Sequence, residues 1–225
     1  MITFKRPDGK DCSAYYVGPP SGDRAPAVVV IQEWWGLNDQ IKGEAQRLAN
    51  AGYRALVPDL YRGKLGLDAK EAEHLMSTLD FGDAATQDIR GAVQHLKQTS
   101  SEVAVTGFCM GGALTLLAAV NVPEADAFMT WYGYPPLEYV DATKIKAPIL
   151  GHWSLHDVYF PVQQVDALEE KLKKANVQYE FYRYNAKHAF ANEMNKDPSA
   201  PIAYDATAAE AAWDRTMTFL KKHLG

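Results

Sequence analysis

The chain has 225 residues, of which 47% are hydrophobic and 23% are charged, and its formal net charge is -5. This length suits one sizeable domain, and a negative net charge provides no basic surface for binding nucleic acid. No stretch is apolar for long enough to span a membrane, and the first residues lack the apolar core of a signal peptide, so we expect a cytoplasmic protein. We also expect a monomer with a single domain over 1–225.

The first part of the chain predicts a hairpin followed by alternating strands and helices. Residues 1–17 are polar enough to form an antiparallel hairpin at the edge of a sheet. The unbroken apolar run 27–31 predicts a buried strand. Apolar residues at helical spacing predict a helix over 39–50 that ends at Gly52, and a further strand follows over 53–57.

The alternation continues to the end of the chain. We expect helices over 69–79 and 84–98, a strand over 103–106, a helix over 111–120, strands near 127–132 and 147–152, a helix near 161–174, a strand near 178–184 and a helix near 207–223. Strands that alternate with helices predict an α/β fold, in which helices cover both faces of a mostly parallel central sheet.

Reactive side chains gather where the predicted strands end. Glu33 follows the strand 27–31, and Cys109 follows the strand 103–106. The strands near 147–152 and 178–184 are followed by further acids and bases, namely His152 at the end of the first, then His156 and Asp157, and finally His188. Because ligands of such sheets bind at the carboxyl ends of the strands, we expect these residues to share one site.

Residues 107–112 read GFCMGG between a predicted strand and a predicted helix. This is the setting of a nucleophile elbow, a sharp turn that normally carries serine and here carries Cys109. Gly107 and Gly111 provide the small residues that the turn needs, and the start of the helix favours a thiolate. Nucleophile, acid and histidine follow one another in this fold, which predicts Cys109, Asp157 and His188 as a catalytic triad.

Other readings of these residues stay open at this point. Cys109 could be a small residue packed in a turn, and His156 is the next candidate for a base. We interpret His152, beside Trp153, as structural, and Cys12 as incidental. No cluster has the spacing of metal ligands, and the turn lacks the lysine of a phosphate loop, so we expect neither a metal nor another cofactor.

The sequence resembles the dienelactone hydrolase family, whose members are α/β-hydrolases with a Cys-Asp-His triad. The resemblance runs along almost the whole chain and is carried by QEWWGLN at 32–38, PDLY at 58–61, GFCMGG at 107–112, the loop of Asp157, and HAF at 188–190. It implies that Cys109 is the nucleophile, that His188 is the base and that Asp157 orients it. It also implies an oxyanion hole made by the backbone N–H groups of Trp34 and Met110.

The resemblance gives Glu33 a role and leaves two positions different. The glutamate at this position in the family interacts with the resting thiol and helps to form the thiolate when substrate arrives. The family's type enzyme binds a substrate carboxylate through two arginines, where this chain has Ala69 and Asn192. We therefore expect a pocket without strong preference for an anionic substrate, unless Arg62 or Lys64 replaces those arginines.

The leading hypothesis is a hydrolase of small-molecule carboxylic esters or lactones that works through an acyl-enzyme on Cys109. A thiol redox sensor or a ligand-binding protein on the same fold is the alternative, and a transferase that uses the same acyl-enzyme stays open. Aromatic residues lie near the predicted site, and we expect part of this group to line the substrate pocket and the rest to pack in the core: Trp34, Trp35, Trp131, Tyr132, Phe160 and Phe190.

Overall fold

The computed structural model describes residues 1–19 and 24–225. Its strands form one sheet in the order β1-β2-β4-β3-β5-β6-β7-β8. The first two strands are antiparallel to their neighbours, and the other pairs are parallel. The strands are β1 (Ile2–Lys5), β2 (Asp11–Val17), β3 (Ala27–Ile31), β4 (Arg54–Pro58), β5 (Val103–Phe108), β6 (Ala127–Trp131), β7 (Ile149–His156) and β8 (Tyr179–Lys187). The predicted edge hairpin and α/β-hydrolase fold are confirmed.

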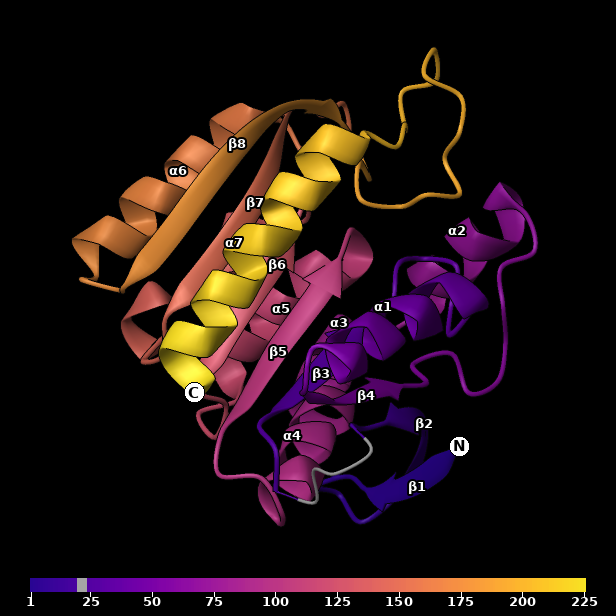
Figure 1. The fold of residues 1–225 in the computed structure, drawn as a ribbon, viewed down its shortest axis with the longest axis vertical. Helices are drawn as coiled ribbons and strands as arrows, with labels where there is room; N and C mark the ends of the chain where they lie inside the picture. The colour runs from indigo at the N-terminus through magenta and orange to yellow at the C-terminus, as the bar shows by residue number, and fades with distance from the viewer. Residues whose placement is uncertain (20–23) are drawn as a thin grey trace.

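Helices cover both faces of this sheet, and Figure 1 shows α1 and α7 together in front of it. The helical elements are α1 (Asp39–Asn50), α2 (Ala69–Thr78), α3 (Phe81–Asp83), the π-helical η1 (Ala84–Ile89), α4 (Arg90–Lys97), α5 (Met110–Asn121), the 3-10 helices η2 (Leu137–Tyr139) and η3 (Ala142–Lys144), α6 (Val162–Lys174) and α7 (Ala206–Leu224). None of the described helices is long and apolar enough to cross a membrane.

The central strand β3 shows why its sequence is apolar without interruption. Val28 and Val30 pack in the cluster that contains α1 and α7, whereas Val29 and Ile31 pack in the cluster that contains α4, α5 and α6. Successive side chains of a strand point to opposite faces, so a strand covered on both sides needs apolar residues throughout.

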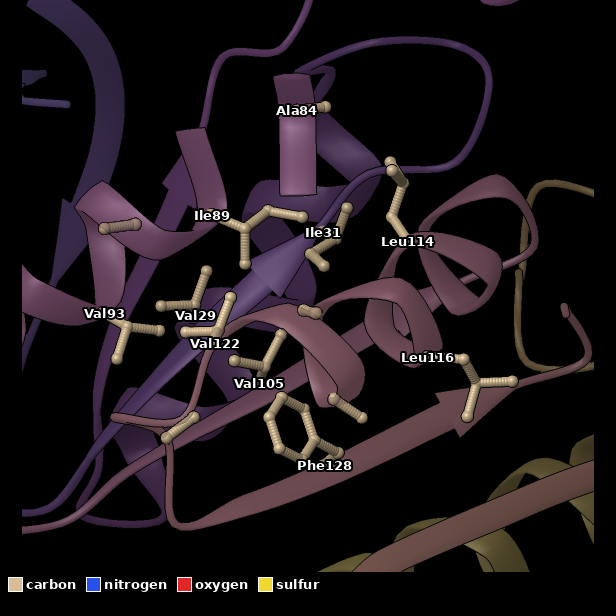
Figure 2. Close-up of a cluster of buried hydrophobic side chains, with 14 of the residues drawn as sticks. Val29, Ile31, Ala84, Ile89, Val93, Val105, Leu114, Leu116, Val122 and Phe128 are labelled. Carbon is tan, nitrogen blue, oxygen red and sulfur yellow. The ribbon is translucent and has the colours of Figure 1, made fainter. Parts of the chain in front are cut away.

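Figure 2 shows the core between the sheet and the helices η1, α4 and α5. Val29 and Val105 of neighbouring strands are fully buried there, together with Ile89 of η1, Val93 of α4 and Leu114 of α5. This packing fixes α5 against β3 and β5. The turn between β5 and α5, which carries Cys109, is therefore held by the core on both sides.

Several boundaries differ from the sequence prediction. β7 continues to His156 and β8 to Lys187, because the two strands keep pairing, with an irregularity between Ser154 and His156, beyond their apolar residues. His156 thus belongs to a strand and not to the following loop. The predicted helix 84–98 begins as the π-helical η1, and the prediction of a regular helix over those first residues was wrong.

Candidate active site

Cys109 lies at the sharp turn between β5 and α5. Its backbone has φ 54° and ψ -116°, a conformation that residues other than glycine rarely adopt. Such a conformation costs on the order of 1–3 kcal/mol and persists only where the surroundings enforce it. The predicted strained strand-to-helix turn is confirmed.

Three glycines provide the space for this turn. A Cβ atom on Gly107 would lie 2.1 Å from the carbonyl oxygen of Gly111, and one on Gly111 would lie 2.5 Å from that of Ile31. A Cβ atom on Gly133 would lie 1.9 Å from the carbonyl oxygen of Cys109. The first two were predicted from the motif. Gly133 was not, because it follows β6 and only the fold brings it to the turn.

The structure brings Cys109, Asp157 and His188 together in one hydrogen-bonded chain. His188 Nε2 lies 3.1 Å from Cys109 Sγ, and His188 Nδ1 lies 2.7 Å from Asp157 Oδ2. The other carboxylate oxygen of Asp157 accepts hydrogen bonds from the backbone N–H groups of Tyr159 and Phe160, at 2.9 and 2.8 Å. Asp157 and His188 directly follow β7 and β8, so parallel neighbouring strands deliver both residues to one edge of the sheet.

The surroundings of His188 favour its charged form. Burial alone disfavours the imidazolium, but the hydrogen bonds to Asp157 and Cys109 outweigh it and raise the pKa of His188 to about 10. The ring of Phe160 stacks on the imidazole at 5.5 Å, and that of Tyr159 lies 5.1 Å away. Aromatic faces attract a cation at such distances. The carboxylate of Asp157 and the two aromatic rings therefore all stabilise a positive charge on His188 beside Sγ.

Glu33 is buried beside the same site but does not bind the thiol. Its Oε2 accepts a hydrogen bond from Asn192 Nδ2 at 2.7 Å, and its Oε1 accepts a longer one from the Tyr132 hydroxyl at 3.4 Å. Burial raises the pKa of Glu33, although these bonds and His188 oppose the shift. Within the described part of the chain no hydrogen bond joins Glu33 to Cys109, and the carboxylate is instead held by Asn192 and Tyr132.

The two predicted oxyanion donors have free backbone N–H groups. No acceptor for the N–H of Trp34 or of Met110 is present among residues 1–19 and 24–225. Met110 begins α5, where the N–H groups of the first turn lack partners within the helix. Both residues line the same cavity as Cys109.

This cavity has a volume of about 500 Å³ and is almost entirely apolar. Of the aromatic residues predicted beside the site, Trp34, Trp35 and Phe160 line it. Trp131, Tyr132 and Phe190 do not, because they are buried at 2%, 1% and 0% exposure and pack between the sheet and α7. These three residues therefore belong to the part of the group that packs in the core. Three tyrosines that the sequence reading missed also line the cavity, namely Tyr134, Tyr139 and Tyr159.

No lysine or arginine of the described residues lines this cavity. Arg62 instead binds the carboxylate of Asp88 at 2.8 Å, and Lys64 lies on a separate surface groove with Asp68. Neither therefore replaces the arginines that were expected from the resemblance. Ala69 begins α2, and Asn192 is engaged with Glu33.

The remaining candidates fall outside the site. His152 is fully buried, with its ring nitrogens 2.8 Å from the hydroxyl groups of Tyr184 and Thr216. His156 is exposed and pairs with Asn185 at 2.6 Å. Cys12 is buried in β2, and burial raises the pKa of its thiol to about 12, so it is a poor nucleophile. Over the ranges that the structure describes, no group of three His, Cys, Asp or Glu residues could hold a metal ion.

Comparison with known proteins agrees with the fold and the motifs. The family model of the dienelactone hydrolase family matches residues 12–224. "Protein usf" of Aquifex pyrophilus is 32% identical over 235 residues, covering 100% of this chain and 98% of that protein. A Salmonella typhi protein, whose name proposes a carboxymethylenebutenolidase, is 30% identical over 100% of this chain and 87% of its own length. A crystal structure from Klebsiella pneumoniae, titled as a proposed dienelactone hydrolase, superposes with a TM-score of 0.85 at 25% identity, covering 99% of this chain and 98% of that one.

Proposed function

Because this chain belongs to the dienelactone hydrolase family and is a carboxylic ester hydrolase, we propose that it cleaves esters and lactones through an acyl-enzyme on Cys109. His188 acts as the base and Asp157 orients it. The observation that carries this proposal is the hydrogen-bonded chain from Asp157 through His188 to Cys109, at a strained turn on the wall of an apolar cavity.

In the first half of the reaction, His188 Nε2 takes the thiol proton of Cys109, and Sγ attacks the carbonyl carbon of the ester. The negative charge that develops on the carbonyl oxygen is stabilised by the N–H groups of Trp34 and Met110. One such donor is typically worth about a hundred- to a thousandfold in rate. The bond to the leaving oxygen then breaks, His188 Nε2 gives that oxygen a proton, and the acyl group remains on sulfur as a thioester.

In the second half, His188 takes a proton from a water molecule, whose oxygen attacks the thioester carbon. The same two N–H groups stabilise the second oxyanion. The bond between carbon and sulfur breaks, the carboxylic acid leaves, and Cys109 is restored. Asp157 keeps Nδ1 of His188 protonated throughout, so that Nε2 faces the sulfur and the water.

Glu33 would help to form the thiolate when substrate arrives, as the resemblance implies. It is held by Asn192 and Tyr132, and burial raises its pKa. Asn192 stands at the position of a family arginine. It would hold Glu33 in place and would provide no positive charge to bind a substrate carboxylate.

The alternative of a thiol redox sensor has less support. Sensing needs a reactive thiol, but it needs neither a base positioned by a carboxylate nor free amide donors facing a cavity. The second thiol, Cys12, is buried in β2 and is held by Arg62 at 3.4 Å, so it is unsuited to form a disulfide with Cys109.

Turnover of p-nitrophenyl acetate by single-residue variants tests the proposal. Cys109→Ala and His188→Ala should each abolish turnover while the circular dichroism spectrum is retained, and Cys109→Ser should retain at most weak activity. Asp157→Asn should lose a factor on the order of 10⁴ in kcat, because the imidazole is misoriented. His156→Ala is the matched control and should keep wild-type activity. Near-full activity of His188→Ala would rule out the assignment of the base.

A further inference from the structure

We infer that the substrate is an uncharged ester whose acyl group is an extended apolar chain of up to about nine carbons, lying along helix α5 as far as Leu117. This inference rests on the proposed acyl-enzyme, and it names the class of substrate. Its basis is the direction in which the cavity extends from Cys109.

One face of α5 forms a wall of the cavity. Met110, Ala113 and Leu117 all line it, and they follow one another at intervals of three and four residues. Residues at this spacing lie above one another on the same side of a helix. The cavity therefore continues along the helix axis, away from the turn that carries Cys109.

The length of this wall limits the length of the acyl chain. Leu117 follows Cys109 by eight residues (117 − 109), and a helix rises 1.5 Å per residue, which places Leu117 about 12 Å along the axis. An extended hydrocarbon chain advances by about 1.3 Å per carbon, given a C–C bond of about 1.5 Å. A chain bound to the sulfur would thus reach Leu117 with about nine carbons.

The chemistry of the wall favours a hydrocarbon. Further lining residues come from neighbouring elements, namely Met76 of α2, Phe81 of α3 and Tyr139 of η2. No charged side chain of the described residues lines the cavity apart from Glu33 and His188 beside the thiol. Each methylene group buried here should therefore increase kcat/KM, by at most about fourfold.

The acyl group is the part of the substrate that the cavity along α5 should hold. It stays bound to Cys109 between the two halves of the reaction, whereas the alcohol must leave before water attacks. Met110 joins the two functions, since its N–H is a proposed oxyanion donor and it begins the apolar face that continues to Ala113 and Leu117.

The experiment is a chain-length profile, in which kcat/KM is measured for p-nitrophenyl esters from acetate to dodecanoate. The wild type should improve with length up to octanoate or decanoate and then decline. Leu117→Trp should lower the ratio of the decanoate value to the acetate value at least tenfold, and Ala113→Leu should move the optimum to still shorter chains. Leu117→Ala, which removes bulk and cannot block the cavity, should move the optimum to longer chains.

Val120→Trp is the matched control, because Val120 lies one turn further along α5 and does not line the cavity. It should keep the wild-type profile. A wild-type profile that is flat or falls from acetate onward would overturn the inference, and so would a length dependence that appears only when the alcohol of acetate esters is lengthened. Acetate turnover that depends on Cys109 would, in either case, leave the proposed function standing.

Discussion

Cys109 keeps its strained backbone because the residues around it leave room for no other arrangement. Gly133, from the turn after β6, approaches the carbonyl group of Cys109 more closely than any side chain could. The amide N–H of Cys109 donates to the carbonyl oxygen of Trp131 at 3.0 Å, which ties the turn to the same strand. The position of Sγ therefore depends on β6 as well as on β5 and α5.

Gly133→Ala should reduce catalysis strongly. The new Cβ atom would lie 1.9 Å from the carbonyl oxygen of Cys109, so the turn must shift. A displacement of a reacting group by about 1 Å can cost about a hundredfold in rate, and overpacking typically costs about 1–3 kcal/mol of stability. The measurements are kcat/KM for p-nitrophenyl acetate and the urea unfolding midpoint. Gly43→Ala in α1, where nothing lies within 4 Å, is the control and should keep full activity. Wild-type activity of Gly133→Ala would contradict this account of the turn.

The residues of the site could be predicted to different degrees. Cys109 and His188 could be predicted because each lies in a short motif beside a strand end. The order of nucleophile, acid and histidine along the chain then selected Asp157. Asn192 was noticed only as a missing arginine, and its bond to Glu33 spans 159 positions of the sequence. The aromatic residues could not be divided between pocket and core, because the sequence does not show which side of a strand end faces the cavity.

At the scale of elements, His152 connects three parts of the fold. It lies on β7, and its ring nitrogens meet Tyr184 of β8 and Thr216 of α7 at 2.8 Å. Burial, together with the positive charge of Arg215, lowers the pKa of His152 to about 3. The neutral imidazole is thus part of the packing between the sheet and α7.

This connection predicts a dependence of stability on pH. The folded-state pKa of His152 is about 3, below the ordinary value of 6.5. Below pH 6.5 the unfolded chain binds a proton that the folded protein does not. The free energy of unfolding should therefore fall as the pH is lowered from 6.5 toward 3, by up to about 1.4 kcal/mol per pH unit. Urea unfolding between pH 7 and 4.5 measures this slope.

A substitution of His152 shows whether this residue causes the slope of the free energy of unfolding against pH. His152→Gln should be less stable at pH 7 and should lose this part of the pH dependence, because glutamine does not titrate. His156→Gln, at an exposed position of the same strand, is the control and should keep the wild-type slope. Equal slopes for wild type and His152→Gln would show that other groups cause the dependence.

Element types were predictable where the apolar pattern is strong, as at β3, β5 and α5. The boundaries of strands were less predictable where the pairing between strands continues past the apolar residues. β7 carries Leu155 and His156, both exposed, and a pattern of burial cannot assign such residues to a strand. The π-helical η1 carries Asp88, which binds Arg6 at 3.2 Å and Arg62 at 2.8 Å, and neither contact is visible from local sequence.

At the scale of the whole molecule, the distribution of charge bears on the substrate. The net charge is -5, and the cavity holds no lysine or arginine of the described residues. Within the described residues, a substrate carboxylate would thus find only His188 as a basic side chain in the cavity. We therefore expect this site to admit a neutral group.

The expected result is that a neutral ester reacts at least as fast as its carboxylate-bearing analogue. A charge-assisted contact to arginine is typically worth about 1.5–3 kcal/mol, or about ten- to more than a hundredfold in affinity. Its absence should be visible when kcat/KM is compared for a matched pair of aryl esters, one neutral and one anionic. A strong preference for the anion would contradict this description of the cavity.

Mass spectrometry of the enzyme quenched during turnover of p-nitrophenyl acetate tests the proposed acyl-enzyme on Cys109 directly. We expect an acetyl group on the peptide that contains Cys109, formed within the first turnover and lost at a rate equal to or above kcat. The adduct should be absent in Cys109→Ala and should accumulate in variants that slow the attack of water. Steady turnover without an adduct on Cys109, an adduct confined to Cys12, or a Cys109 adduct that is never released would contradict the proposed acyl-enzyme.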